Sequence, residues 1–194
     1  VDFTISELKA GSVTATEMKT GGQTVAQILS VYTVAELLAS SYTITEMKTD
    51  GVTAAQLRDE GKTVGELKAD YTVDELQEVY ETEELLVEFR LSQLRSGTVS
   101  VSELKAAGIL LYQLQSVYTV AELLTAYTVA ELKNADVTAT QMKAAGKNVA
   151  GLLNTYTVAE LLAANYTLTE MKLGGVNATQ MKEEGKTVAD LFVV

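Results

Sequence analysis

The segment YTVAELLASSYTITEMKTDGVTAAQLRDEGKTVGELKAD, residues 32–70, contains one short motif four times with small changes. Its units begin at Tyr32, Tyr42, Val52 and Lys62, and each has threonine second and glutamate or glutamine three residues after that threonine. Threonine is a good helix N-cap, and a Glu or Gln three residues on can accept a hydrogen bond from the cap's own N–H, which completes a capping box. Each copy of the motif therefore predicts the start of a short α-helix.

The same motif recurs over nearly the whole chain, in twenty repeat units of nine or ten residues. Thr, Ser or Asn stands second in seventeen of them, and Glu or Gln follows three residues later in eighteen. The next position is Leu, Met or Ile in all twenty and holds all five methionines, so it predicts the line of the core. The units begin at Phe3, Val13, Gln23, Tyr32, Tyr42, Val52, Lys62, Tyr71, Tyr80, Phe89, Val99, Ile109, Tyr118, Tyr127, Val137, Lys147, Tyr156, Tyr166, Val176 and Lys186.

Each unit reads as a two-turn helix, a tight turn and the next helix. A β-solenoid is the competing interpretation of a short period rich in Thr and Val, but the apolar residues do not alternate as in strands. Helices this short are not stable alone, so they must be held by their neighbours, as in a solenoid. Many ten-residue units close on glycine, which can adopt the left-handed conformation that ends a helix; these are Gly51, Gly61, Gly108, Gly146, Gly175 and Gly185.

A longer period of four helices, about 39 residues, lies above the short one. The first two helices of each set carry a base after the invariant apolar residue: Lys9, Lys19, Lys48, Arg58, Arg95, Lys105, Lys133, Lys143, Lys172 and Lys182. The other two more often carry a second apolar residue there: Leu29, Leu38, Leu124, Leu153, Leu162 and Phe192. We therefore expect an all-α solenoid, a superhelical array of about twenty two-turn helices that forms one continuous domain over residues 1–194, with an irregular stretch near 80–112.

Composition excludes several classes of function. With no cysteine and no histidine, the chain cannot build a disulfide framework, a thiolate zinc site or a histidine-based catalytic system. The net charge of −11 opposes nucleic-acid binding, and no apolar run approaches the roughly 18 residues that a membrane span needs. We expect no enzyme activity, no cofactor and no catalytic or metal site.

Three surface patterns have both a functional and a plain interpretation. The acidic patch Glu78, Glu81, Glu83, Glu84 and Glu88 has oxygen ligands for a hard cation, but a solvated charged face is the favoured interpretation. The stripe of bases could meet an anionic polymer, although long lysine stems more often cover apolar surface beside glutamates. Threonines one position into the helices could form an ice- or surface-binding array: Thr16, Thr45, Thr140, Thr169 and Thr179.

Both termini carry apolar residues where a monomeric solenoid normally has a polar capping repeat. Either these ends stack head to tail on other copies, or the molecule is excised from a longer array. The possible end-to-end interface comprises Val1, Phe3, Leu191, Phe192, Val193 and Val194.

The unit pattern of Tyr, Phe or Val, then Thr or Ser, two residues, Glu, Leu or Met, and Lys or Leu resembles the short ELKxAG-type repeats of large repetitive proteins from microbes, algae and viruses. The resemblance covers almost the whole chain and implies an architecture but no activity. We expect a self-associating structural protein, plausibly of an extracellular fibre or cell-surface assembly, whose partners are copies of itself or another protein. The alternative is an α-solenoid scaffold that binds a protein or peptide on its concave face.

Overall fold

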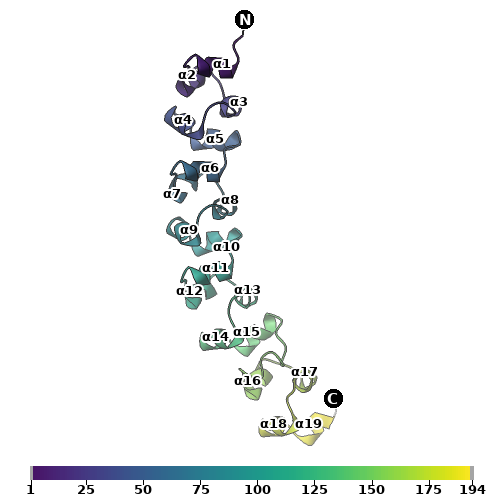
Figure 1. The fold of residues 1–194 in the computed structure, drawn as a ribbon. Helices are drawn as coiled ribbons and strands as arrows, with labels where there is room; N and C mark the ends of the chain where they lie inside the picture. Colours follow the sequence, from purple (N-terminus) through teal and green to yellow (C-terminus); the bar gives the residue numbers. More distant parts are fainter. Residues whose placement is uncertain (1, 193–194) are drawn as a thin grey trace. The chain divides into compact units, whose positions relative to one another are not determined.

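The computed structural model describes residues 2–192, and over that range the chain is all-α, as the capping pattern predicts. Its nineteen short helices are joined by tight turns, and no strand occurs among the described residues (Figure 1). The chain divides into two compact units, Val1–Val99 and Ser100–Val194. That the array forms a single domain stays a prediction. Val1, Val193 and Val194 of the predicted end interface lie outside the described residues.

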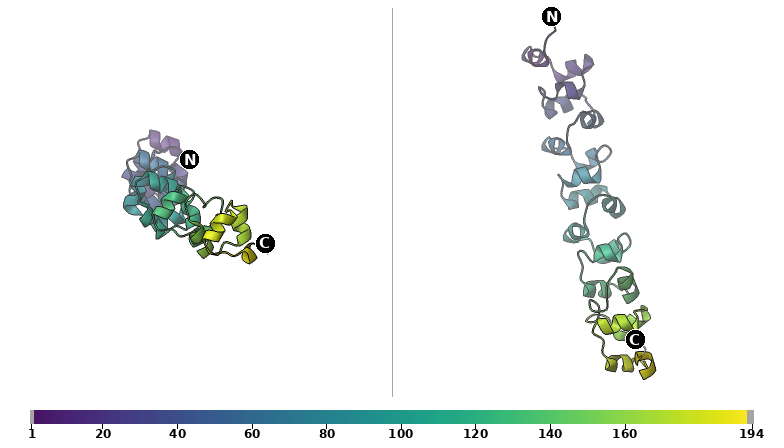
Figure 2. Two further views of the ribbon diagram at one scale, coloured as in Figure 1. Left: turned by 90° about the horizontal axis from the view of Figure 1, so that it is seen from below. Right: turned by 90° about the vertical axis from the view of Figure 1, so that its right-hand side faces the viewer.

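Unit 1 holds ten helices: α1 (Ile5–Ala10), α2 (Ala15–Thr20), α3 (Val25–Ile28), α4 (Val34–Ala39), α5 (Ile44–Thr49), α6 (Ala54–Asp59), α7 (Val64–Leu67), α8 (Val73–Gln77), α9 (Thr82–Glu88) and α10 (Leu91–Ser96). Unit 2 holds nine: α11 (Val101–Ala106), α12 (Leu111–Gln115), α13 (Val120–Leu123), α14 (Val129–Asn134), α15 (Ala139–Ala144), α16 (Val158–Ala163), α17 (Leu168–Leu173), α18 (Ala178–Glu183) and α19 (Val188–Phe192). Within each unit, helices contact neighbours one or two positions along the chain (Figure 2).

The capping boxes form as the sequence predicts. In α4, Thr33 Oγ1 accepts the Glu36 backbone N–H at 3.3 Å, and Glu36 Oε2 accepts the Thr33 N–H at 2.7 Å. A cap side chain accepts the same N–H in fifteen of the described helices. Each such cap stabilises its helix by about 1 kcal/mol, which matters greatly for helices of four to six residues.

Three helices have an N-cap residue other than Thr, Ser or Asn, and its side chain makes no cap hydrogen bond: Glu81, Arg90 and Leu110. Their backbone N–H groups still donate to the glutamate or glutamine three residues on, at 3.0 Å in each case. The glutamate half of the capping box therefore suffices to start a helix where the threonine half is missing.

One unit departs from the predicted two-turn helix. A bend at residue 149 and consecutive turns over residues 150–155 replace the helix, because Gly151 stands where eighteen repeats have Glu or Gln. Asn148 Oδ1 accepts the Gly151 N–H at 3.0 Å, but glycine has no side chain to complete the box and has low helix propensity.

Eleven of the twelve ten-residue repeats turn through one residue with positive φ; the exception is the repeat that begins at Phe89, where Gly97 has a φ of −84°. All six glycines singled out from the sequence are in this conformation, as is Gly22. Four units achieve it without glycine: Ser12, Ser41, Asp136 and Asn165, at φ values of 60–68°. The nine-residue units need no such residue, so the extra residue of the longer unit is the turn itself.

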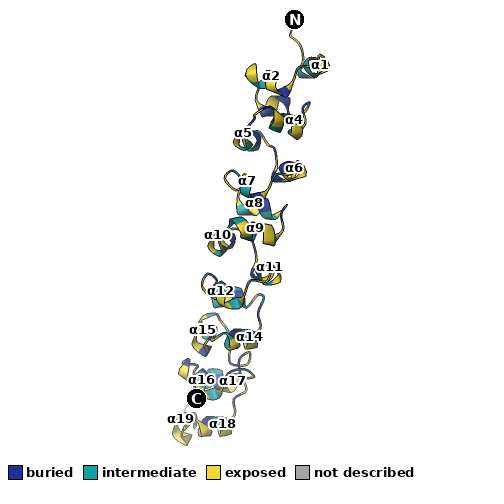
Figure 3. Cartoon of the chain, turned by 90° about the vertical axis from the view of Figure 1, so that its left-hand side faces the viewer, coloured by how far each residue is buried: buried dark blue, intermediate teal, exposed yellow. Residues whose placement is uncertain are grey.

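The position that is Leu, Met or Ile in all twenty repeats forms the core of each of the two compact units. Leu37, Met47 and Leu57 are fully buried, and so are most of their counterparts along the chain. In Figure 3, a single short helix carries both buried and exposed residues. Only the first and last of these positions, Leu8 and Leu191, are half-buried, because each lacks neighbours on one side.

Candidate functional site

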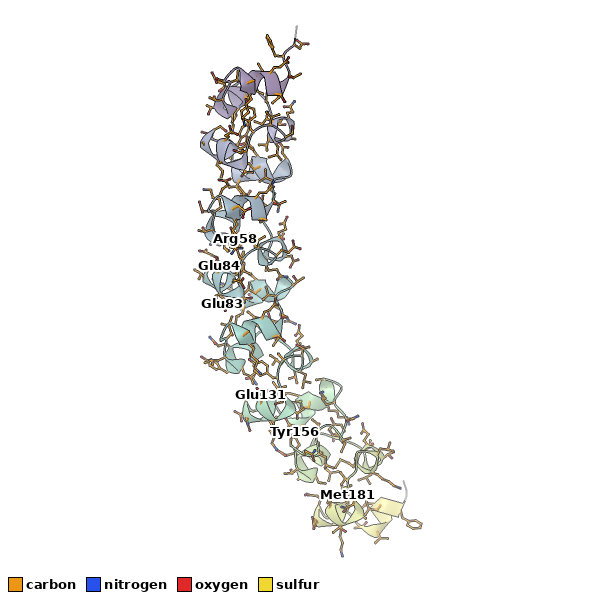
Figure 4. All side chains as sticks on the ribbon, viewed as in Figure 1. Arg58, Glu83, Glu84, Glu131, Tyr156 and Met181 are labelled. Carbon is orange, nitrogen blue, oxygen red and sulfur yellow. The ribbon has the colours of Figure 1, made fainter. Side chains whose placement is uncertain are left out.

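The stripe of bases lies along the contacts between repeats. Lys133 Nζ sits 4.6 Å from the centroid of the Tyr156 ring and donates to the Thr155 carbonyl at 2.8 Å and to Glu160 Oε2 at 2.8 Å. The capping glutamate thus receives a lysine from the unit three positions earlier while still capping its own helix. Figure 4 labels Tyr156 in unit 2.

This arrangement recurs six times, and we call each instance a Lys–Tyr–Glu cluster. The Nζ–carboxylate distances span 2.7–3.3 Å and the distances from Nζ to the ring centroid span 4.0–4.7 Å. Lysine and glutamate are separated by 26 or 27 residues. The clusters are Lys9–Tyr32–Glu36, Lys19–Tyr42–Glu46, Lys48–Tyr71–Glu75, Lys105–Tyr127–Glu131, Lys133–Tyr156–Glu160 and Lys143–Tyr166–Glu170.

The tyrosines add a second bond between repeats. Tyr156 is buried, and its hydroxyl donates to the Val137 carbonyl, 19 residues earlier, at 2.5 Å. Tyr32, Tyr42 and Tyr71 make the same bond at 2.6–2.7 Å, and Tyr166 makes it at 2.5 Å. Each tyrosine therefore satisfies a main-chain carbonyl between helices that would otherwise lose its hydrogen bond to water.

The electrostatics of the clusters favour the charge states that the contacts need. The hydrogen bond from Lys9 lowers the pKa of Glu36, with the Thr33 N–H as the next cause. The Thr128 N–H, followed by Lys105, lowers the pKa of Glu131 to about 2. Burial raises the pKa of Tyr71 to about 12, so at neutral pH the glutamates are ionised and the tyrosine is neutral.

Each of four clusters lines a shallow hollow of its own, and the volumes of these hollows are 390–420 Å³. One is lined by Lys9, Tyr32 and Glu36 on one side and by Ser12 and the start of α2 on the other. Its counterparts are lined by the clusters of Lys19, Lys133 and Lys143. The hollows are thus a repeated feature of the array.

Three residues of the predicted end interface lie in the described range, and two of them are largely exposed. Phe3 is 68% exposed and Phe192 is 88% exposed, whereas Leu191 is half-buried. Two further apolar side chains in the last helices, Leu173 and Val188, are also largely exposed and were not predicted to be.

A fifth hollow of 290 Å³, which we call the end hollow, lies among the last helices. It is lined by Leu168, Lys172, Val176, Asn177, Ala178, Met181 and Leu191. Figure 4 labels Met181 there. Lys172 belongs to the stripe of bases, yet neither it nor Lys182 forms an ion pair with any residue of the range 2–192.

The acidic patch does not gather around one point. No group of three acidic side chains within the described range is arranged to hold a metal ion, and Glu88 instead pairs with Lys68 at 2.6 Å. Figure 4 labels Glu83 and Glu84, and also Arg58, whose guanidinium carbon lies 5.3 Å from the centroid of the Tyr80 ring.

Of the threonines predicted to face outward, Thr45 is engaged, since its hydroxyl donates to Asp70 at 2.5 Å.

The sequence missed the role of the tyrosines, which it assigned only to helix entry. The available signal was that each of these bases has a tyrosine about 23 residues later in the sequence. Comparisons with protein-family models, curated proteins and solved structures give no match. Among residues 2–192, no helix has the length and apolar character needed to cross a bilayer.

Proposed function

We propose that this chain is a non-enzymatic structural repeat protein that associates head to tail with copies of itself into a fibre or surface assembly. The observation that carries the proposal is where the repeated polar side chains go. Cap threonines bond to helix N–H groups, capping glutamates to cap N–H groups and lysines, and tyrosine hydroxyls to carbonyls two units away. The recurring chemistry is used for holding repeats together.

Self-association is supported by the two exposed ends. Large apolar side chains remain at both, with Phe3 at one and Phe192 at the other. Because repeats in such arrays contact only near neighbours, the face that ends one array is similar to the face that each internal repeat covers. A second copy can therefore continue the same packing.

Sedimentation velocity over a wide range of concentrations tests this proposal. We expect the 194-residue chain to form species that grow in mass with concentration and appear elongated in negative-stain micrographs. Phe192→Asp should suppress this growth, whereas Val87→Asp, at a side chain 79% exposed away from both ends, should not. A chain that stays monomeric throughout, or loses association equally in both variants, would overturn end-to-end stacking.

The repeated hollows favour a second candidate, a scaffold that binds an extended peptide or protein. Four hollows of similar volume, two in each compact unit, are each lined by a lysine, a tyrosine and a carboxylate and so offer equivalent contacts. This candidate predicts a monomer whose binding to a selected peptide weakens when hollows are filled, for example by Ala39→Leu. Unchanged binding in such variants would count against it.

A further inference from the structure

The surface around α12 departs from two rules that most of the array follows. Its N-cap residue is Leu110, whose side chain makes no cap hydrogen bond, and Tyr112 stands two residues later. Leu110 is 57% exposed and Tyr112 is 66% exposed. A missing cap and two large exposed apolar side chains both cost local stability, and such departures are expected where a surface has a function. We call these two residues the α12 patch.

The repeat that begins at Gln23 shows that the fold does not require an apolar pair here. It matches residues 109–117 in length, in the glutamine of the capping box and in its final Ser-Val. At the two positions of the α12 patch it has Thr24 and Ala26, and both are exposed. Exposure is therefore a property of the position in the repeat, whereas the large apolar side chains are particular to residues 109–117.

The α12 patch lies in a segment that carries no charge. No Asp, Glu, Lys or Arg occurs in residues 106–121, although the net charge of the chain is −11. The flanking charges are engaged, since Lys105 Nζ lies 2.9 Å from Glu131 Oε1 and Glu122 Oε2 accepts the Thr119 N–H at 2.6 Å. The centres of protein interfaces are depleted in charged residues and enriched in tyrosine, and the α12 patch has this composition.

The polar groups next to the α12 patch already have partners within the chain. The Leu110 N–H donates to Gln113 Oε1 at 3.0 Å, and Ser116 Oγ donates to the Gln113 carbonyl at 2.7 Å. Gln115 Nε2 donates to the Ala135 carbonyl at 2.8 Å. Covering the α12 patch therefore leaves these donors paired, and their burial does not carry the cost of an unpaired polar group.

We propose that the α12 patch is a lateral contact between two copies of this chain, in which Tyr112 of each copy packs on Leu110 of the other. A twofold contact places the same surface on both sides, so each uncharged apolar patch meets another. Elsewhere the negative charge of both copies opposes their approach, and a positively charged partner would be attracted to the carboxylates outside residues 106–121. The contact goes beyond head-to-tail association, because it uses neither Phe3 nor Phe192.

Sedimentation equilibrium of the Phe192→Asp chain isolates the lateral contact, since head-to-tail growth should be suppressed in this variant. We expect a dimer that tightens as NaCl rises from about 20 mM to about 500 mM, because salt screens the repulsion between two copies of charge −11. Leu110→Thr with Tyr112→Ala, which introduces the residue types of the Gln23 repeat, should weaken the dimer by about 10- to 100-fold. Leu173→Thr, at a side chain 82% exposed in the same compact unit, should change it by less than about 2-fold.

Leu110→Thr alone separates association from folding. Thr138 Oγ1 accepts the Gln141 N–H at 3.3 Å across the same three-residue spacing, so the substitution should give α12 a cap. We expect the urea midpoint of the dilute protein to rise by about 0.5 M while the dimer weakens. A gain in stability together with a loss of association cannot result from misfolding.

Tyr112→Trp in the Phe192→Asp chain introduces a single tryptophan as a probe of burial. Its fluorescence emission should shift to shorter wavelength as the dimer forms, whereas the emission of Leu173→Trp in the same background should stay constant. A Phe192→Asp chain that remains monomeric up to about 1 mM overturns the lateral contact, and so does a Tyr112→Trp emission that does not shift. A dimer that weakens with salt, or that is unchanged by Leu110→Thr with Tyr112→Ala, also overturns it.

These outcomes are distinct from a failure of head-to-tail association. If the unsubstituted chain forms elongated species while the Phe192→Asp chain is monomeric, only the lateral contact is refuted. If the unsubstituted chain forms the dimer and nothing larger, only head-to-tail association is refuted. A chain that is monomeric in both forms refutes both.

Discussion

Removing one hydroxyl from the Tyr156 side chain tests whether tyrosines hold successive repeats together. The hydroxyl donates to the Val137 carbonyl at 2.5 Å, and both residues are buried. Tyr156→Phe keeps the ring under Lys133 but deletes the donor, so the carbonyl loses this partner without gaining access to water. We expect unfolding free energy to fall by about 1–2 kcal/mol, which combines a lost hydrogen bond with part of the cost of a buried acceptor left unpaired.

Urea unfolding followed by circular dichroism at 222 nm measures this change. With a slope of about 2 kcal/mol per molar, the transition midpoint should move down by roughly 0.5–1 M. Tyr112→Phe is the matched control, since Tyr112 is 66% exposed, and its unfolding free energy should stay within about 0.5 kcal/mol of the parent's. Equal midpoints for the two variants would refute the view that the hydroxyl joins repeats; a loss without a change in slope would support it.

Three further changes probe the turns, caps and charges. Gly151→Glu should complete a capping box on Asn148, raise helix content by about one turn and stabilise the chain by about 1 kcal/mol; a flat helical signal would contradict this, since a Cβ at Gly151 meets atoms only at 3.4 Å or more. Ser41→Gly should stabilise by about 0.5–1 kcal/mol because Ser41 has φ of 68°, whereas Gly51→Ala, at φ of 96°, should destabilise by about 1 kcal/mol; thermal melts with the same sign for both would refute the turn assignment. Because the pKa values of the capping glutamates are lowered on folding, their contribution is present above the unfolded value near 4.5 and is lost as pH falls toward about 2, the pKa of Glu131; melts that are unchanged between pH 5 and pH 2.5 would exclude it.

Much of the local structure was predictable because its hydrogen bonds span only a few residues. The Thr33–Glu36 box depends on a three-residue spacing that is visible in the sequence, and Gly51 announces its left-handed turn. Ser41 was not predicted to occupy the same conformation, because serine adopts it only where the surrounding packing imposes it. The prediction of a two-turn helix around Gly151 was wrong because glycine has no side chain. It cannot supply the half of the capping box that Glu or Gln supplies in other repeats.

The candidate site divides in the same way. The exposed Phe3 and Phe192 could be predicted because both are apolar residues in the first and last repeats of the sequence. The end hollow could not be predicted, nor could a Lys172 that has no ion pair within residues 2–192, because recognising them requires knowing that Lys133 reaches Tyr156 and Glu160. That reach follows from the packing of repeats.

By itself, the sequence determined where helices begin, where most of them turn and which residue of each faces the core, since these depend on bonds and periodicities within one unit. Only the tertiary structure decided what the lysines and tyrosines do. Contacts 18 to 27 residues apart depend on the rise and rotation from one repeat to the next, and these are set by how apolar side chains such as Leu132 and Leu161 pack between helices.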